Sequence, residues 1–173
     1  MIILLTGGSG CGKSTFAERL VDAMPKENRI YIATMQVYDE ESERRVARHR
    51  AQRADKGFSA TIERQKDLGS LVLPAGSSVL LEDLPNLLAN EMFDGGDWTR
   101  IVPGLRALSE RCKNLVMVTN DVFSDGVTYA PSTREYLRRM AQVIAGAAAL
   151  ADSVAEVVYS IPVPIKGGLP PCV

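Results

Sequence analysis

One stretch of the sequence has residue types and spacing that suit phosphate chemistry. Residues 7–14 read G-G-S-G-C-G-K-S and match G-x-x-x-x-G-K-[ST], the Walker A or P-loop pattern, at every position. In such a loop glycines let backbone N–H groups surround phosphate oxygens, the lysine reaches the β- and γ-phosphates, and the serine hydroxyl binds Mg²⁺. The pattern predicts that Lys13 is catalytic and that Ser14 is a metal ligand. The expected nucleotide contacts are Gly7, Gly8, Ser9, Gly10, Cys11, Gly12, Lys13 and Ser14.

The residues on either side of this loop favour a P-loop over a chance glycine-rich turn. Residues 1–5 are apolar and β-prone, and residues 14–24 carry apolar side chains at helical spacing: Phe16, Leu20, Val21 and Met24. Strand, loop and helix therefore follow one another in the required order. The positive end of that helix would face the phosphates.

Polar side chains also follow two later apolar strands. Residues 78–82 read S-V-L-L-E and end at Glu82 and Asp83, the kind of position where P-loop proteins keep a carboxylate for Mg²⁺. Either acid can serve by position, or both can simply open the next helix; we favour Glu82, which also matches the family described below. Asn120 and Asp121 end the next strand, where they would orient a second substrate or a water, or form a simple turn.

His49 is the only histidine, and four arginines lie next to it or one helical turn away: Arg45, Arg48, Arg50 and Arg53. Nearby positive charge disfavours the imidazolium form, so the ring would be neutral and nucleophilic near pH 7. The arginines would hold a triphosphate whose α-phosphorus the imidazole attacks. The alternative is a solvated histidine on a charged surface helix, with the arginines paired to the acids that precede them.

Strands alternate with helices along the whole chain, which predicts a single α/β domain over residues 1–173. The expected strands are 1–5, 29–34, 59–63, 78–82, 115–119 and 155–159. The expected helices are 14–24, 39–56, 84–93, 98–112 and 132–150, the last opened by a capping box of Ser132 and Glu135. The fold class is a P-loop NTPase, a RecA-like, mostly parallel sheet with helices on both faces and the ligand over the carboxyl ends of the strands. The Pro-rich tail 161–173 cannot be helical and is expected on the surface or at a partner.

Composition limits the class of ligand. The 173 residues include 20 basic and 21 acidic side chains, so bulk charge does not favour nucleic acid or an anionic membrane, and a small ligand is expected. The cysteines are odd in number and widely spaced, which excludes a disulfide framework or zinc site and indicates a reducing, cytoplasmic protein. The alanine-rich run that ends at Asp152 is too short to span a bilayer, and no targeting segment is expected.

Five segments, spread through most of the chain, share motifs with one known family. They are I-L-L-T-G-G-x-x-x-G-K-S (3–14), Y-I-A-T-x-Q-x-x-D-x-E (31–41), R-[VI]-x-x-H-[RK]-x-x-R (45–53), V-L-L-E (79–82) and V-T-N-[DE]-V (118–122). The chain thereby resembles the bifunctional adenosylcobinamide kinase/adenosylcobinamide-phosphate guanylyltransferases of cobalamin biosynthesis. The resemblance implies a homotrimeric enzyme that uses Mg²⁺ with ATP or GTP. It would phosphorylate adenosylcobinamide and then transfer GMP from GTP to give adenosylcobinamide-GDP.

The resemblance also implies roles for matching residues. His49 would be the covalently guanylylated histidine. Ala33, Thr34 and Met35 would line the nucleotide at the end of the second strand. Arg50 and Arg53, just after the histidine, would bind its phosphates. Glu63 and Glu82 match acidic nucleotide or metal contacts, Glu63 after a small insertion.

Some positions depart from the family pattern. Residues 9–11 (S-G-C) lack an arginine that is frequent there, Arg48 replaces the first of two histidines, and Phe123 replaces a glycine. An alanine replaces the asparagine of the last long helix, and the P-V-P-I-K-G tail is also unlike the family. Two alternative functions therefore remain open: a P-loop small-molecule kinase without guanylyltransferase activity, and a non-catalytic RecA-like nucleotide-binding regulatory protein.

Overall fold

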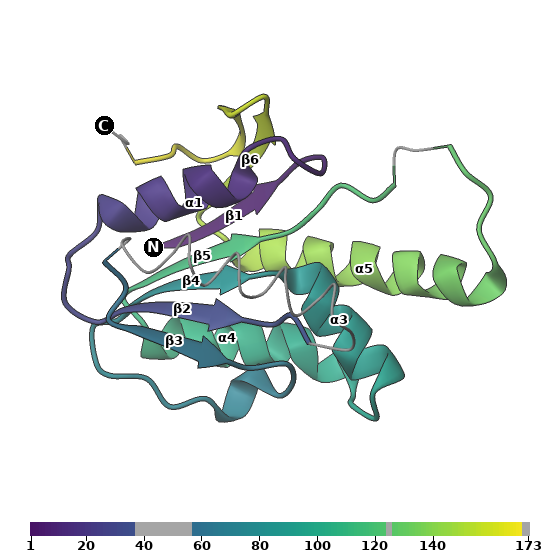
Figure 1. Cartoon of the computed structure of the whole chain (residues 1–173), viewed down its shortest axis with the longest axis horizontal. Helices are drawn as coiled ribbons and strands as arrows, with labels where there is room; N and C mark the ends of the chain where they lie inside the picture. The colour runs from purple at the N-terminus through teal and green to yellow at the C-terminus, as the bar shows by residue number, and fades with distance from the viewer. Residues whose placement is uncertain (37–56, 124–125, 171–173) are drawn as a thin grey trace.

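A seven-stranded sheet forms the centre of the computed structural model, which describes residues 1–36, 57–123 and 126–170 (Figure 1). The strand order is β3-β2-β4-β5-β1-β6-β7, with parallel pairing except between β6 and β7. The strands are β1 (Ile2–Thr6), β2 (Arg29–Ala33), β3 (Ala60–Glu63), β4 (Ser78–Glu82), β5 (Asn114–Val118), β6 (Ser153–Val158) and β7 (Ile161–Lys166). The predicted fold class, an α/β protein with a mostly parallel sheet, is confirmed.

Helices cover both faces of this sheet. The α-helices are α1 (Lys13–Asp22), α3 (Leu84–Phe93), α4 (Ile101–Arg111) and α5 (Pro131–Leu150). Short 3₁₀ turns are η1 (Leu68–Ser70) and η2 (Trp98–Arg100). Figure 1 shows α1 on one side of the strands and α3, α4 and α5 on the other. The helix predicted at 39–56 lies outside the described residues.

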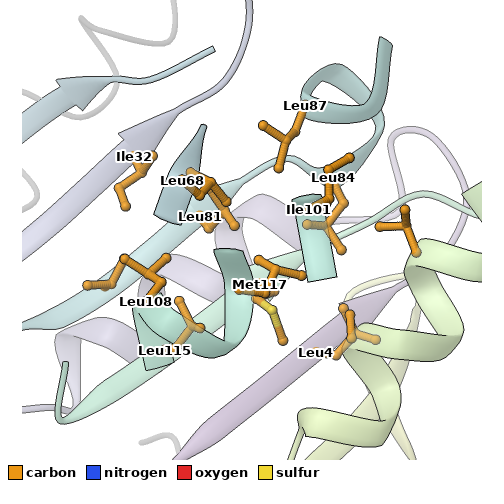
Figure 2. Packing of buried hydrophobic residues seen from close by; sticks show 14 of the residues in the cluster. Leu4, Ile32, Leu68, Leu81, Leu84, Leu87, Ile101, Leu108, Leu115 and Met117 are labelled. Carbon is orange, nitrogen blue, oxygen red and sulfur yellow. The ribbon is translucent and has the colours of Figure 1, made fainter. Parts of the chain in front are cut away.

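Alternating side chains of the five central strands, β2, β4, β5, β1 and β6, enter two different cores. In β1, Leu4 packs toward α3, α4 and α5, whereas Ile3 and Leu5 pack toward α1. Figure 2 shows the first of these cores, where Met117 of β5 and Leu81 of β4 lie among side chains from the helices. Because both faces are buried, these strands read as continuous apolar runs in the sequence. In β4 the only charged side chain, Glu82, consequently stands at the end of the strand.

The start of α5 differs from the sequence prediction. The N-cap position is Ala130, with no side-chain hydrogen bond, and Pro131 occupies the first turn, where its lack of an N–H is not a disadvantage. Glu135 accepts hydrogen bonds from Arg138 and Arg139, which hold the pKa of its carboxyl at about 2. The predicted capping box of Ser132 and Glu135 is therefore wrong, because the carboxylate binds the arginines of the next turn instead.

The tail contains a strand that its prolines did not suggest. Residues 161–166 form β7, which pairs antiparallel with β6 at the edge of the sheet, and residues 171–173 lie outside the described residues. Prolines are tolerated in an edge strand because one side of its backbone has no partner to bond. The tail is thus non-helical and largely exposed, as predicted, but it is part of the sheet.

No helix in the described part of the chain is long and apolar enough to cross a membrane.

Gly146 of α5 allows α5 to approach α4 closely. A Cβ at this position would lie 2.6 Å from Cγ2 of Val102 and 3.0 Å from its Cγ1. We expect Gly146→Ala to lower the free energy of unfolding by about 1–3 kcal/mol, the usual cost of overpacking, although alanine is the better helix former. Urea denaturation followed by circular dichroism measures this change.

Val102→Ala supplies the matched background, because it removes the two methyl groups that the new Cβ would meet. There the same Gly146→Ala change should raise the free energy of unfolding by up to about 1 kcal/mol through helix propensity. Stabilisation by Gly146→Ala in the unmodified chain would contradict the close approach of the two helices.

Candidate active site

The glycine-rich loop, residues 7–14, joins β1 to α1 at the carboxyl edge of the sheet. Gly12 is the N-cap of α1 and has φ +92°, and Gly10 has φ +70°, conformations that favour glycine. The first turn of α1 carries no acidic side chain. The N–H groups and the positive end of α1 are therefore not offset by a local carboxylate, which suits an anion.

Lys13 lies back across this loop. Its ammonium donates a hydrogen bond to the carbonyl oxygen of Gly8 at 2.6 Å and lies 3.8 Å from Sγ of Cys11. Lys13 as a whole is only 6% exposed. A positive charge is thus held over the loop by a backbone acceptor, where it can instead bind the oxygens of an incoming phosphate.

Neighbouring strand ends brace the loop by close backbone contact. A Cβ on Gly7 would lie 2.5 Å from the carbonyl oxygen of Val157, and a Cβ on Gly12 would overlap Oγ of Ser160. The Ser160 N–H donates to the carbonyl oxygen of Cys11 at 2.8 Å. The turn between β6 and β7 therefore lies directly on the loop, and these two glycines leave room for it.

Glu82 links the loop to the sheet. Its Oε1 accepts a hydrogen bond from Oγ of Ser14, and its Oε2 accepts one from the hydroxyl of Tyr31 at 2.6 Å. A hydroxyl beside a carboxylate is a hard oxygen donor pair, which fits Mg²⁺ completed by phosphate and water ligands. Among the described residues, no group of three or more His, Cys, Asp or Glu side chains is placed to hold a metal, and a Mg²⁺ site of this kind does not require one.

Sequence reasoning assigned no role to Tyr31. A signal was present, because Tyr31 stands between Ile30 and Ile32 in a buried strand and so lies on the opposite face from them. Its ring also packs edge-on against Phe58, with centroids 5.6 Å apart. Tyr31 positions the Glu82 carboxylate from a buried and fixed ring.

The adjacent Asp83 has a different environment. Its Oδ1 accepts from the backbone N–H and from Nδ2 of Asn86, both at 2.8 Å, which makes Asp83 the N-cap of α3. Burial raises the pKa of its carboxyl to about 6, with a further upward contribution from the charge of Glu82, against the lowering effect of the Asn86 hydrogen bonds. Position in the sequence does not separate the two acids, but geometry does: Glu82 contacts the glycine-rich loop and Asp83 caps a helix.

The side chain of Thr34 is buried beneath this edge. Its Oγ1 accepts from the N–H of Asp83 and donates to the carbonyl oxygen of Asp83, both at 2.8 Å, while Nδ2 of Asn90 donates to the carbonyl oxygen of Thr34 at 2.8 Å. Because Thr34 is 0% exposed, it braces the ends of β2, β4 and α3 and does not present its hydroxyl to a ligand.

The other predicted contacts at β2 and β3 lie along the same edge. Ala33 pairs in register with both Glu63 and Glu82, so the two acids are separated by two strand spacings, about 10 Å. Glu63 is exposed and Met35 is half-buried. The structure thus puts Glu63, Ala33 and Glu82 in one row.

Asn120 and Asp121 meet the loop from β5. The N–H of Asp121 donates to the carbonyl oxygen of Gly7 at 2.9 Å, and its Oδ1 accepts from the N–H of Phe123 at 3.1 Å. Asn120 is half-buried. This arrangement is a turn that also braces the glycine-rich loop.

The predicted nucleophile and its neighbours, His49, Arg50 and Arg53, lie outside the described residues.

A strand, a glycine-rich loop and a helix in that order, a lysine over the loop and a carboxylate at a neighbouring strand end define a P-loop α/β protein. The particular family follows from comparison of the sequence. Residues 3–165 match the family model for CobU, cobinamide kinase / cobinamide phosphate guanyltransferase. The chain therefore belongs to this family of transferases, and the family predicted from the motifs is confirmed.

Three curated relatives support this assignment over nearly their whole lengths. The "Bifunctional adenosylcobalamin biosynthesis protein CobU" of Escherichia coli K12 is 35% identical, over 96% of this chain and 100% of the relative. The protein of the same name from Salmonella typhimurium LT2 is 34% identical over the same shares of the two chains. The "Bifunctional adenosylcobalamin biosynthesis protein CobP" of Pseudomonas aeruginosa PAO1 is 28% identical, over 95% of this chain and 96% of the relative.

The raised pKa of Asp83 predicts a pH dependence of stability. In the folded chain the pKa of the Asp83 carboxyl is about 6, whereas the ordinary pKa of an aspartate side chain is 3.8. The protonated carboxyl therefore makes its full contribution to the free energy of unfolding below about pH 4, and this contribution is lost as the pH rises through about 6. Relative to Asp83→Asn, which keeps an N-cap acceptor but cannot ionise, the unmodified chain should lose at most about 3 kcal/mol of unfolding free energy across this range.

Urea denaturation in metal-free buffer at about pH 4 and pH 7 measures the difference. Asp97→Asn is the matched control, since Asp97 also caps a short helix but hydrogen bonds from Thr99 lower its pKa. Its contribution should change in the opposite direction, growing as pH rises. Parallel pH curves for the unmodified chain and Asp83→Asn would show that the carboxyl of Asp83 has an ordinary pKa.

Proposed function

We propose that this chain phosphorylates the aminopropanol hydroxyl of adenosylcobinamide and then transfers GMP from GTP to the product, giving adenosylcobinamide-GDP in cobalamin biosynthesis. The observation that carries the proposal is the contact between Ser14 of the glycine-rich loop and Glu82, beside Lys13, in a chain of the cobinamide kinase family. The names of the relatives, which describe bifunctional proteins of adenosylcobalamin biosynthesis, support both halves.

In the first half, the substrate hydroxyl oxygen attacks the γ-phosphorus of ATP or GTP. The bond from that phosphorus to the β,γ-bridging oxygen breaks, the nucleoside diphosphate leaves, and the hydroxyl proton is released. Lys13 binds the β- and γ-phosphate oxygens and balances their charge. Ser14 and Glu82 would hold Mg²⁺, which neutralises developing charge on the phosphate oxygens. Tyr31 keeps the Glu82 carboxylate turned toward the loop.

In the second half, an imidazole nitrogen of His49 attacks the α-phosphorus of GTP and pyrophosphate leaves. The resulting phosphoramidate is then attacked by a phosphate oxygen of adenosylcobinamide phosphate, which takes the GMP group and frees His49. A covalent intermediate divides one difficult displacement into two easier ones. The resemblance of residues 45–53 to the family motif supports this role for His49.

The remaining nucleotide contacts are proposed on the same resemblance. Arg50 and Arg53 would hold phosphates of the guanine nucleotide, and Ala33, Met35 and Glu63 would border it along the edge of β2 and β3. Thr34 would act through the strand ends that it braces. We also propose a cytoplasmic homotrimer as the working form.

Incubation with GTP labelled at the α-phosphorus tests the covalent step. With Mg²⁺, the unmodified chain should gain the mass of one GMP in an acid-labile linkage, and His49→Ala should gain none because it lacks the nucleophile. Intact-protein mass spectrometry measures both. His49→Ala should still phosphorylate adenosylcobinamide, which shows that the variant is folded.

Two results would change the proposal. An unmodified chain that phosphorylates the corrinoid without forming an adduct would be a kinase only. A chain that binds nucleotide and transfers neither group would be a regulatory nucleotide-binding protein.

Glu82→Gln tests the metal assignment. We expect kcat/KM for phosphorylation to fall about 100-fold, with a higher Mg²⁺ concentration needed for half-maximal rate, because an amide balances less charge than a carboxylate. A coupled assay of nucleoside diphosphate release at varied Mg²⁺ measures both quantities. Glu110→Gln, at an exposed position of α4, is the control and should behave as the unmodified chain. An unchanged Mg²⁺ dependence in Glu82→Gln would remove Glu82 from the metal site.

A further inference from the structure

The turn between β6 and β7 has an unusual backbone. Tyr159 has φ +48° and Ser160 has φ +66°, so two successive residues with side chains adopt the left-handed conformation. Hairpin turns of this shape favour Asn, Asp and Gly, because a Cβ is otherwise crowded there. Such residues persist where the surrounding structure imposes the conformation, and they are frequent at ligand sites.

This turn is hydrogen-bonded to the glycine-rich loop and packs closely against it. The Ser160 N–H donates to the carbonyl oxygen of Cys11 at 2.8 Å, and the side chain of Ser160 lies where a Cβ of Gly12 would be. Gly12 is the N-cap of α1, next to Lys13. The position of Tyr159 is therefore fixed relative to the place where phosphates would bind.

The ring of Tyr159 contributes almost nothing to the protein core. Tyr159 is 89% exposed, and it belongs to neither of the two cores. An aromatic side chain held in the open by a constrained backbone provides a flat apolar surface for a ligand.

The sheet order determines which part of a nucleotide would reach this ring. The glycine-rich loop follows β1. On one side of β1, two strands away, β4 ends at Glu82. On the other side, the adjacent strand β6 leads into the turn that carries Tyr159. With the terminal phosphates at Lys13, Ser14 and Glu82, as proposed above, the nucleoside would extend past the start of α1 toward β6. The ring of Tyr159 would then lie on the nucleoside side of the loop.

We propose that Tyr159 stacks against the purine base of the nucleotide whose phosphates occupy the glycine-rich loop. The inference rests on the proposed function, because it requires that the loop binds a nucleoside triphosphate, and it adds a residue that recognises the base. Stacking accepts either purine, since every base has an aromatic face. Tyr159 thus contributes to affinity for nucleotide over bare polyphosphate.

Isothermal titration with GTP, ATP and inorganic tripolyphosphate at fixed Mg²⁺ tests this role in the full chain. Tyr159→Asn removes the ring and supplies a residue that this turn tolerates well, so it separates loss of stacking from damage to the turn. We expect Kd for both nucleotides to rise about ten-fold or more, and Kd for tripolyphosphate to stay the same. Tyr159→Phe keeps the ring and should bind all three ligands as the unmodified chain does.

Several outcomes would overturn the proposal. Unchanged nucleotide binding by Tyr159→Asn, or an equal loss for tripolyphosphate, removes the stacking role and leaves the proposed function intact. If Tyr159→Asn changes only the oligomeric state in sedimentation velocity, the ring is a contact between copies, adjoining the exposed apolar side chains of β7. If the unmodified chain binds neither GTP nor ATP, the proposed function fails together with this inference.

Discussion

The Glu82 carboxylate is the link on which the site depends. One oxygen bonds the hydroxyl of Ser14, and the other bonds the buried hydroxyl of Tyr31, so the glycine-rich loop, β4 and β2 are tied together through one side chain. Both bonds are to a charged acceptor, which makes them stronger than neutral hydrogen bonds. The loop also contacts the ends of β5 and β6 through the backbone of Gly7 and Cys11. A flexible glycine-rich segment is consequently held from three sides.

The second layer of polar contacts keeps that carboxylate in position. Thr34 bonds both backbone groups of Asp83, and Asn90 of α3 bonds the carbonyl of Thr34. Asp83 in turn caps α3. These groups are buried and paired, so moving any one of them leaves another without a partner, which is costly in a low-dielectric interior. The strand ends therefore act as a rigid frame, and the ligand-facing groups are carried on it.

The described residues contain the parts suited to phosphoryl transfer, whereas the histidine motif belongs to the segment at 37–56. The proposed two-step chemistry needs only one nucleotide site, which would bind one triphosphate for attack at the γ-phosphorus and a second triphosphate, GTP, for attack at the α-phosphorus. A nucleotide held at its phosphates by Lys13 and at its base by Tyr159 would present both phosphorus atoms to different acceptors. In that arrangement the proposed base contact would help to fix the position of the α-phosphate.

The sequence by itself was sufficient for the fold class, the position of the glycine-rich loop and the family. Those features depend on local patterns: apolar runs for buried strands, glycine spacing for a phosphate loop, and short motifs shared with relatives. The positions of most elements were also predictable, because the central strands are buried on both faces, whereas the exposed edge strand β7 was missed. The prediction of a capping box at Ser132 was wrong, because the Glu135 carboxylate bonds the side chains of Arg138 and Arg139 and not the backbone at the start of the helix.

Only the tertiary structure decided which acid contacts the glycine-rich loop, which side chains hold the site residues in position, and where the tail lies. Glu82 and Asp83 are adjacent and chemically alike. The structure distinguishes them because Glu82 contacts Ser14 of the loop, whereas Asp83 caps α3. Tyr31 and Ser160 contact their partners across 51 and 149 positions of the chain, respectively, the latter to Cys11. Local pattern carries no information on such contacts, because the sheet order, and not the chain order, brings these residues together.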